Sequence, residues 1–126
     1  MASTKKILII DDEPDVLAYL STLLEDHGYA TVTAKDGVEA LTKVKALRPD
    51  LITLDISMPE KSGVKFYREM REDASYQKIP IIIVTGISDD FKNFISTRKQ
   101  VPPPEGYLSK PINQEEMLGL VKKLTA

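Results

Sequence analysis

The sequence contains no cysteine and only one histidine among its 126 residues. The absence of cysteine excludes disulfide bonds, thiolate metal sites and thiol nucleophiles. No apolar run approaches the roughly 20 residues that a membrane-spanning helix requires, and the N-terminal residues lack the pattern of a signal peptide. The formal net charge of −2 gives no strong field for nucleic acid or an anionic membrane. We therefore expect a cytoplasmic protein that contacts neither of them directly.

The composition is otherwise that of an ordinary globular protein, with 42% hydrophobic and 29% charged residues. This length suits one hydrophobic core, so we expect residues 1–126 to form a single domain. Five segments have the composition of strands, at 7–10, 29–33, 51–54, 81–84 and 107–109. Five helical patterns alternate with them and begin near Pro14, Asp36, Ser62, Ser88 and Asn113. The alternation predicts an α/β fold, a doubly wound five-stranded parallel sheet with five helices on both faces.

Two of the helical patterns begin with a capping box. Asp36 and Asn113 are each followed three residues later by a glutamate, which in this motif reaches back to the amide of the capping residue. The helix after Asp36 is expected to bury one apolar face, made of Val38, Leu41, Val44 and Leu47.

Charged and hydroxyl side chains directly follow four of the predicted strands. They are Asp11, Asp12 and Glu13 after the first strand, Asp55 after the third, Thr85 after the fourth and Lys110 after the fifth. Acidic residues that open a helix are by themselves explained by the helix dipole, a contribution of about 0.3–1 kcal/mol. That explanation does not extend to the whole set. Because ligands bind at the carboxyl ends of strands in open parallel sheets, the set predicts one functional site.

The residue types at these strand ends favour a divalent cation and phosphoryl chemistry. Two unit charges 4 Å apart repel by about 4 kcal/mol at an effective dielectric constant near 20, and one lysine does not neutralise three carboxylates. A site made of oxygen ligands suits Mg²⁺, whereas the lack of histidine and cysteine argues against zinc. A carboxylate can act as a nucleophile and form an acyl phosphate, whose charge a metal ion, an ammonium and a hydroxyl stabilise.

The order and spacing of these motifs resemble the receiver domains of response regulators in two-component signalling. The motifs are Asp11-Asp12 after an apolar strand, Asp55 followed by Met58-Pro59 and Gly63, Thr85 after the fourth strand, and the run from Tyr107 to Pro111. The resemblance covers essentially the whole chain. It implies the flavodoxin-like strand order 2-1-3-4-5, which is the order described for this family.

The resemblance also implies a role for each site residue. Asp55 would accept a phosphoryl group from a histidine kinase, a phosphotransfer protein or a small acyl phosphate. Mg²⁺ would be bound by Asp11, Asp12, Asp55 and the backbone carbonyl of Ser57.

Two further residues, Thr85 and Lys110, would contact the phosphoryl group, the latter before a cis peptide bond to Pro111. Thr85 and Tyr107 would form the conformational switch that signals to a downstream protein partner.

The segment before the fifth strand departs from the family pattern. Pro102, Pro103 and Pro104 stand where the family has the end of a fourth helix. Proline lacks an amide donor and disfavours helix at the preceding residue, so we expect a short or irregular fourth helix that ends near Lys99. The surface that meets the partner is expected to differ accordingly.

Three other functions compete with this interpretation. A Mg²⁺-dependent phosphohydrolase that uses an aspartyl phosphate usually has a second acid two residues after its nucleophile, and that position is Ser57. A flavodoxin-like nucleotide binder would need a phosphate loop, and no glycine-rich segment follows the first strand. A pseudo-receiver that serves only as a scaffold would not need the complete set of site residues. We therefore expect a switch with only self-directed phosphotransfer and autodephosphorylation, which acts by protein contact, serves as a relay or belongs to a longer protein.

Overall fold

The computed structural model describes residues 4–56, 58, 62–86 and 104–126. Its strands form one sheet in the order β2-β1-β3-β4-β5, and all neighbours are parallel. The strands are β1 (Lys6–Ile10), β2 (Ala30–Ala34), β3 (Leu51–Asp55), β4 (Ile81–Thr85) and β5 (Gly106–Ser109). The predicted fold class and strand order are confirmed.

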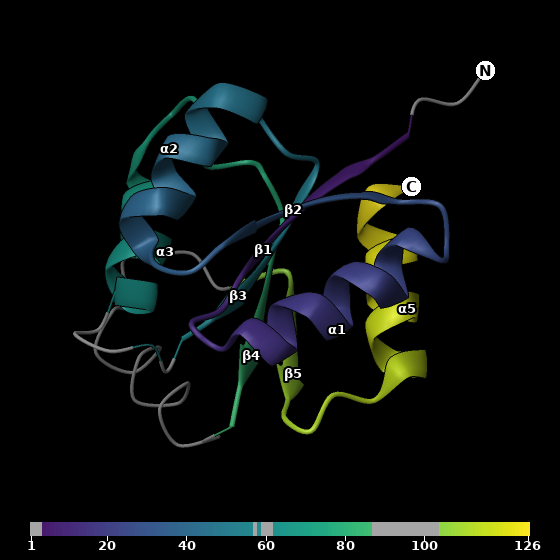
Figure 1. Ribbon diagram of the computed structural model, residues 1–126. Helices are drawn as coiled ribbons and strands as arrows, with labels where there is room; N and C mark the ends of the chain where they lie inside the picture. The colour runs from purple at the N-terminus through teal and green to yellow at the C-terminus, as the bar shows by residue number, and fades with distance from the viewer. Residues whose placement is uncertain (1–3, 57, 59–61, 87–103) are drawn as a thin grey trace.

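Helices cover both faces of this sheet (Figure 1). They are α1 (Pro14–Glu25), α2 (Gly37–Leu47), α3 (Ser62–Glu72) and α5 (Gln114–Thr125). The helix expected between residues 88 and 99 lies outside the described residues. None of the helices in the described part of the chain is long and apolar enough to cross a membrane.

The alternation of side chains along each strand divides the apolar residues into two cores. Ile7 and Ile9 point to the side of α1 and α5, whereas Leu8 and Ile10 point to the side of α2 and α3. Because both faces are covered, the central strands are buried along almost their whole length, in agreement with the continuous apolar runs of the sequence.

Both predicted N-caps are present. Asp36 Oδ1 accepts a hydrogen bond from the Glu39 amide at 2.8 Å, and Asn113 Oδ1 accepts one from the Glu116 amide at 3.0 Å. The returning bond of the first box was predicted wrongly, because Glu39 Oε1 accepts from the Lys35 amide at 3.0 Å and not from that of Asp36.

The predicted buried face of α2 is partly wrong. Val38 and Leu47 are 81% and 38% exposed, while Ala40 and Val44 are fully buried. Each step of three residues falls about 60° short of a full turn in a helix of 3.6 residues per turn. Val38 therefore lies on a different side of the helix from the buried stripe, whereas Leu47 lies on the side of that stripe and is partly exposed as the last residue of α2.

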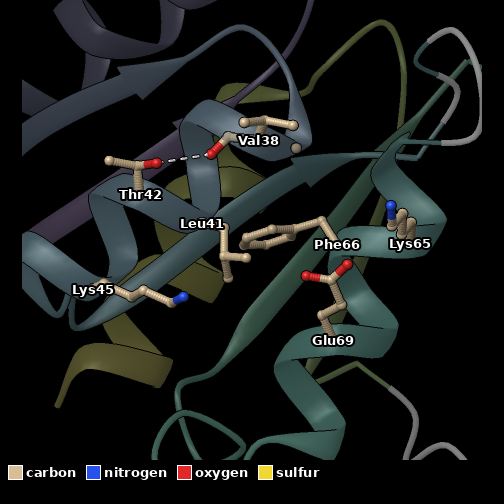
Figure 2. Close-up of a pocket in the computed structure, with 8 residues that line it drawn as sticks. Val38, Leu41, Thr42, Lys45, Lys65, Phe66 and Glu69 are labelled. Carbon is tan, nitrogen blue, oxygen red and sulfur yellow. Dashed lines mark hydrogen bonds between the residues drawn. The ribbon is translucent and has the colours of Figure 1, made fainter.

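An open groove of about 450 Å³ lies between α2 and α3. Figure 2 shows the apolar side chains of Leu41 and Phe66 together in it, with Lys45 and Glu69 alongside. None of the charged residues at the strand ends lines this groove, so the predicted site is elsewhere.

Candidate functional site

The turn that follows β1 fixes the first acidic residues. The Asp11 amide donates to the carbonyl of Ala34 at the end of β2, at 3.1 Å. The Asp11 carboxylate then accepts from the Glu13 amide at 2.9 Å, and α1 begins at the next residue, Pro14. These bonds hold the Asp11 side chain at the carboxyl edge of the sheet.

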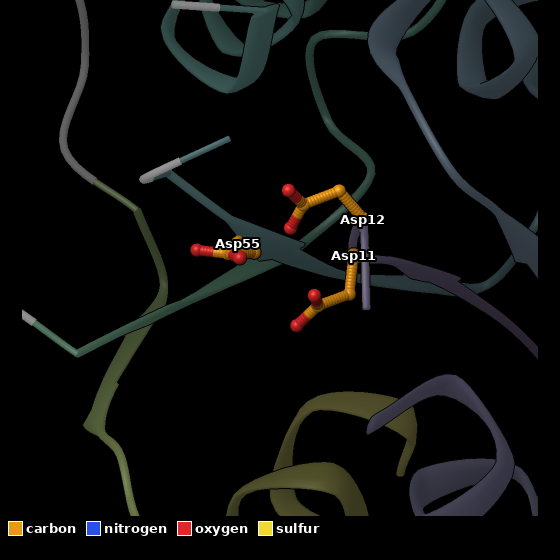
Figure 3. Close-up of side chains that lie close together, drawn as sticks. All are labelled: Asp11, Asp12 and Asp55. Carbon is orange, nitrogen blue, oxygen red and sulfur yellow. The ribbon is translucent and has the colours of Figure 1, made fainter. Parts of the chain in front are cut away.

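Three carboxylates meet at this edge, as the sequence predicted (Figure 3). Oxygen atoms of Asp11, Asp12 and Asp55 all lie within 4.8 Å of one another. Asp11 and Asp55 are only 2% and 3% exposed, whereas Asp12 is exposed. Burial limits the screening of their repulsion by water.

The ammonium of Lys110 is the counter-charge of this cluster. Its Nζ lies 3.0 Å from Asp11 Oδ2, 3.4 Å from Asp55 Oδ2 and 3.5 Å from Glu13 Oε1. Burial acts to lower the pKa of Lys110, but its hydrogen bonds and the charges of Asp11 and Asp55 outweigh burial and raise it above its usual 10.5. Lys110 is therefore held in its charged form.

The Lys110 ammonium does not cancel the effect of burial on the pKa of Asp11. Desolvation raises the pKa of the Asp11 carboxyl above its usual 3.8, against the hydrogen bonds from Glu13 and Lys110, and the nearby charge of Asp55 adds to the rise. The cluster thus has an excess of buried negative charge and offers only oxygen ligands. This donor set fits a hard divalent cation such as Mg²⁺.

The end of β3 is packed closely against the start of α3. A Cβ atom added to Gly63 would lie 2.5 Å from the backbone oxygen of Asp55. Such an approach leaves no space for a larger residue, so Gly63 helps to set the position of the Asp55 backbone. Ser57, the predicted carbonyl ligand, lies outside the described residues.

The carboxyl ends of β4 and β5 complete the edge. Thr85 is fully buried, and its carbonyl accepts from the Lys110 amide at 2.8 Å. Tyr107 is half-buried beside Ile83 of β4 and packs against the core under α2 and α3. The Lys110–Pro111 bond is cis, as the resemblance implied. The switching roles of Thr85 and Tyr107 remain predictions.

Sequence reasoning placed Glu13 at the strand end but gave it no separate role. The structure brings its carboxylate to Lys110, a residue 97 positions away. The signal in the sequence was its place directly after the acidic pair.

Comparison with known proteins agrees with this geometry. The sequence model of the response regulator receiver domain matches residues 7–122. The chain is 31% identical over 121 residues to Protein PilH of Pseudomonas aeruginosa, covering 96% of this chain and 98% of that protein. The structure resembles chemotaxis protein CheY4 of Vibrio cholerae with a TM-score of 0.84 and 33% identity, covering 97% of this chain and 99% of that one.

The chain therefore belongs to the response regulator receiver domain family, whose members are phosphorylation-dependent switches of two-component systems. It is also 34% identical to the alkaline phosphatase synthesis transcriptional regulatory protein PhoP of Bacillus subtilis, over 122 residues. That alignment covers 95% of this chain but only 48% of PhoP, so the chain spans about half the length of that relative. Receiver domains of this family generally use Mg²⁺, in line with the acidic cluster.

Proposed function

We propose that Asp55 is the phosphoacceptor of this receiver and that residues 1–126 act as one phosphorylation-controlled unit. The observation that carries the proposal is the position of the Asp55 carboxylate. It ends β3 within 4.8 Å of the Asp11 and Asp12 oxygens and 3.4 Å from Lys110 Nζ. Two neighbouring carboxylates and the Lys110 ammonium thus surround the Asp55 carboxylate, which is the nucleophile of the proposed reaction.

Phosphorylation of Asp55 is a displacement at phosphorus. A carboxylate oxygen of Asp55 forms the new P–O bond while the P–N bond of a phosphohistidine, or the P–O bond of a small acyl phosphate, breaks. The electron pair of the broken bond leaves with the imidazole, whose second ring nitrogen already carries a proton so that the ring leaves neutral, or with the donor's carboxylate. No net proton transfer by the protein is needed for the acyl-phosphate donor, in keeping with a site that has carboxylates and an ammonium.

The other residues stabilise charge around that step. Asp11, Asp12 and Asp55 would hold Mg²⁺, which supplies positive charge for the phosphoryl oxygens when bound. Lys110 pairs with one phosphoryl oxygen, and the Thr85 hydroxyl donates to another. Because β4 and β5 are adjacent, with Thr85 opposite Ser109, a shift of Thr85 is passed to the strand that carries Tyr107.

The partners follow from the family and are part of the proposal. Receiver domains interact with histidine kinases and with downstream effectors. We assign the chain a histidine kinase or phosphotransfer protein as donor and a protein as target. Its chemistry is confined to phosphorylation and dephosphorylation of its own Asp55, in a cytoplasmic setting where such donors are found.

The proposal is tested by incubation with an acyl phosphate, with and without Mg²⁺, followed by intact-mass measurement. Wild type should gain one phosphoryl group only when Mg²⁺ is present, and Asp55→Asn should gain none. Asp36→Asn, a matched change at a helix cap, should be labelled like wild type. Equal labelling of Asp55→Asn would refute the assignment, and sustained turnover of a generic phosphomonoester would favour a phosphohydrolase.

A further inference from the structure

Lys110 has a carboxylate neighbour that does not belong to the acidic cluster. Glu13 Oε1 lies 3.5 Å from Lys110 Nζ, a distance similar to the 3.4 Å that separates Nζ from Asp55 Oδ2. Glu13 is not among the three carboxylates that come within 4.8 Å of one another. Its side chain does not cap α1 either. The contact with Lys110 therefore has no explanation in metal binding or in helix capping.

We propose that Glu13 is a positioning residue that holds the Lys110 ammonium in the unphosphorylated state and must release it to the phosphoryl group. The inference rests on the role of Lys110 in the proposed function. Glu13, Asp11 and Asp55 compete for one ammonium. Asp11 and Asp55 are also the residues that would share their charge with a metal ion, whereas Glu13 would not. The attraction between Glu13 and Lys110 is therefore the one that persists as the site is prepared for transfer.

The expected effect is small because the pair lies near the surface. The Glu13 side chain is 63% exposed and that of Lys110 is 20% exposed. Water screens such a pair, so we expect removal of the Glu13 charge to raise the rate of Asp55 phosphorylation by about two- to fivefold.

A matched control is available in the first turn of α1. Asp15 is exposed, carries the same charge and forms no ion pair with Lys110 among the described residues. Glu13→Gln and Asp15→Asn therefore change the net charge near the site equally, but only the first removes the contact. Labelling by a small acyl phosphate at saturating Mg²⁺ should accelerate about two- to fivefold in Glu13→Gln and change much less in Asp15→Asn.

The role of Lys110 is isolated by a double-mutant cycle. In a Lys110→Met background, Glu13→Gln should no longer accelerate labelling, because the group that Glu13 holds is missing. An acceleration that persists in this background would overturn the proposal, since it would show a general charge effect. Equal acceleration by Asp15→Asn would overturn it for the same reason.

A second measurement, on metal-free protein, does not depend on phosphorylation. With ¹⁵N-labelled lysine, the Nζ resonance of Lys110, assigned with Lys110→Arg, should shift in Glu13→Gln and stay in place in Asp15→Asn. An unchanged resonance in Glu13→Gln would overturn the proposal. If the resonance shifts but wild type is not labelled at all, the proposed function and the release of Lys110 both fail, and only a structural ion pair remains.

Discussion

Charged side chains gather at opposite edges of the sheet, and the two groups are built differently. At the carboxyl edge, three carboxylates lie within 4.8 Å of one another, and the ammonium of Lys110 pairs with two of them, Asp11 and Asp55. At the amino edge, the buried guanidinium of Arg71 bonds to one carboxylate, that of Glu105, and to the carbonyls of Gln77 and Ile79.

The second group is balanced in charge, because one guanidinium faces one carboxylate. Glu105 also accepts from the Ile81 amide at 2.8 Å, so one carboxylate joins α3 to the starts of β4 and β5. Arg71 additionally lies over the Tyr67 ring, 5.0 Å from its centroid. The amino edge therefore uses its charges to hold elements together. The carboxyl edge keeps an excess of negative charge that suits a cation and a phosphoryl group.

The largest expected effect is the loss of stability when the Arg71–Glu105 pair of the amino edge is removed. Arg71→Met leaves the Glu105 carboxylate and two carbonyls without their partner. We expect the free energy of unfolding to fall by about 2–4 kcal/mol, below the range for a fully buried pair because the Glu105 side chain is 36% exposed. Urea unfolding of wild type and Arg71→Met measures this difference in the free energy of unfolding.

The matched control for that prediction is Arg48→Met. Arg48 donates to the Ser75 carbonyl at 2.8 Å and lies over Tyr76, but at an exposed position. Its loss should cost less than about 1 kcal/mol. Equal losses in the two variants would contradict the account of the amino edge.

The next effect concerns the packing of Asp55. Gly63→Ala would place a Cβ atom 2.5 Å from the Asp55 backbone oxygen, so we expect a loss of about 1–3 kcal/mol and slower phosphorylation. Gly119→Ala, in α5 with no heavy atom within 4 Å of the added Cβ, should gain roughly 0.5–1 kcal/mol. If Gly63→Ala labels at the wild-type rate, the close approach does not position Asp55.

Repulsion among the carboxylates of Asp11, Asp12 and Asp55 should lower the stability of the protein when no metal is present. In chelator, Asp55→Asn should be more stable than wild type by about 0.5–2 kcal/mol, because one of the crowded charges is gone. Added Mg²⁺ should stabilise wild type and reverse this order, because ligands stabilise the state that binds them. Thermal unfolding in both buffers measures the difference. A wild type that is the more stable protein in chelator would show that the carboxylates do not repel appreciably.

The smallest effect is a pH dependence at the amino edge. Burial raises the pKa of the Tyr67 phenol above its usual 10.0, although Arg71 acts in the opposite direction. The unfolded chain therefore loses this proton at lower pH than the folded chain. As pH rises above the unfolded value, wild type should lose stability relative to Tyr67→Phe. Urea unfolding of both proteins at neutral and alkaline pH checks this, and a constant difference between them would contradict it.

Much of the fold was predictable because its signals are local. The continuous apolar runs predicted the strands, and the residues directly after them predicted the acidic cluster. The exposure of Val38 was missed because a spacing of three residues drifts around a helix. The contacts of Glu13 with Lys110 and of Arg71 with Glu105 join residues far apart in the chain. No local pattern shows such pairs, and only the assembled sheet brings them together.

The most direct test of the central claim is to locate the acyl phosphate itself. The protein is incubated with an acyl phosphate and Mg²⁺ and then reduced with borohydride, which converts an aspartyl phosphate to homoserine. The account predicts that peptide sequencing by mass spectrometry finds homoserine at residue 55, and that omission of Mg²⁺ prevents it. Homoserine at Asp11 or Asp12 instead, or labelling that does not depend on Mg²⁺, would contradict it.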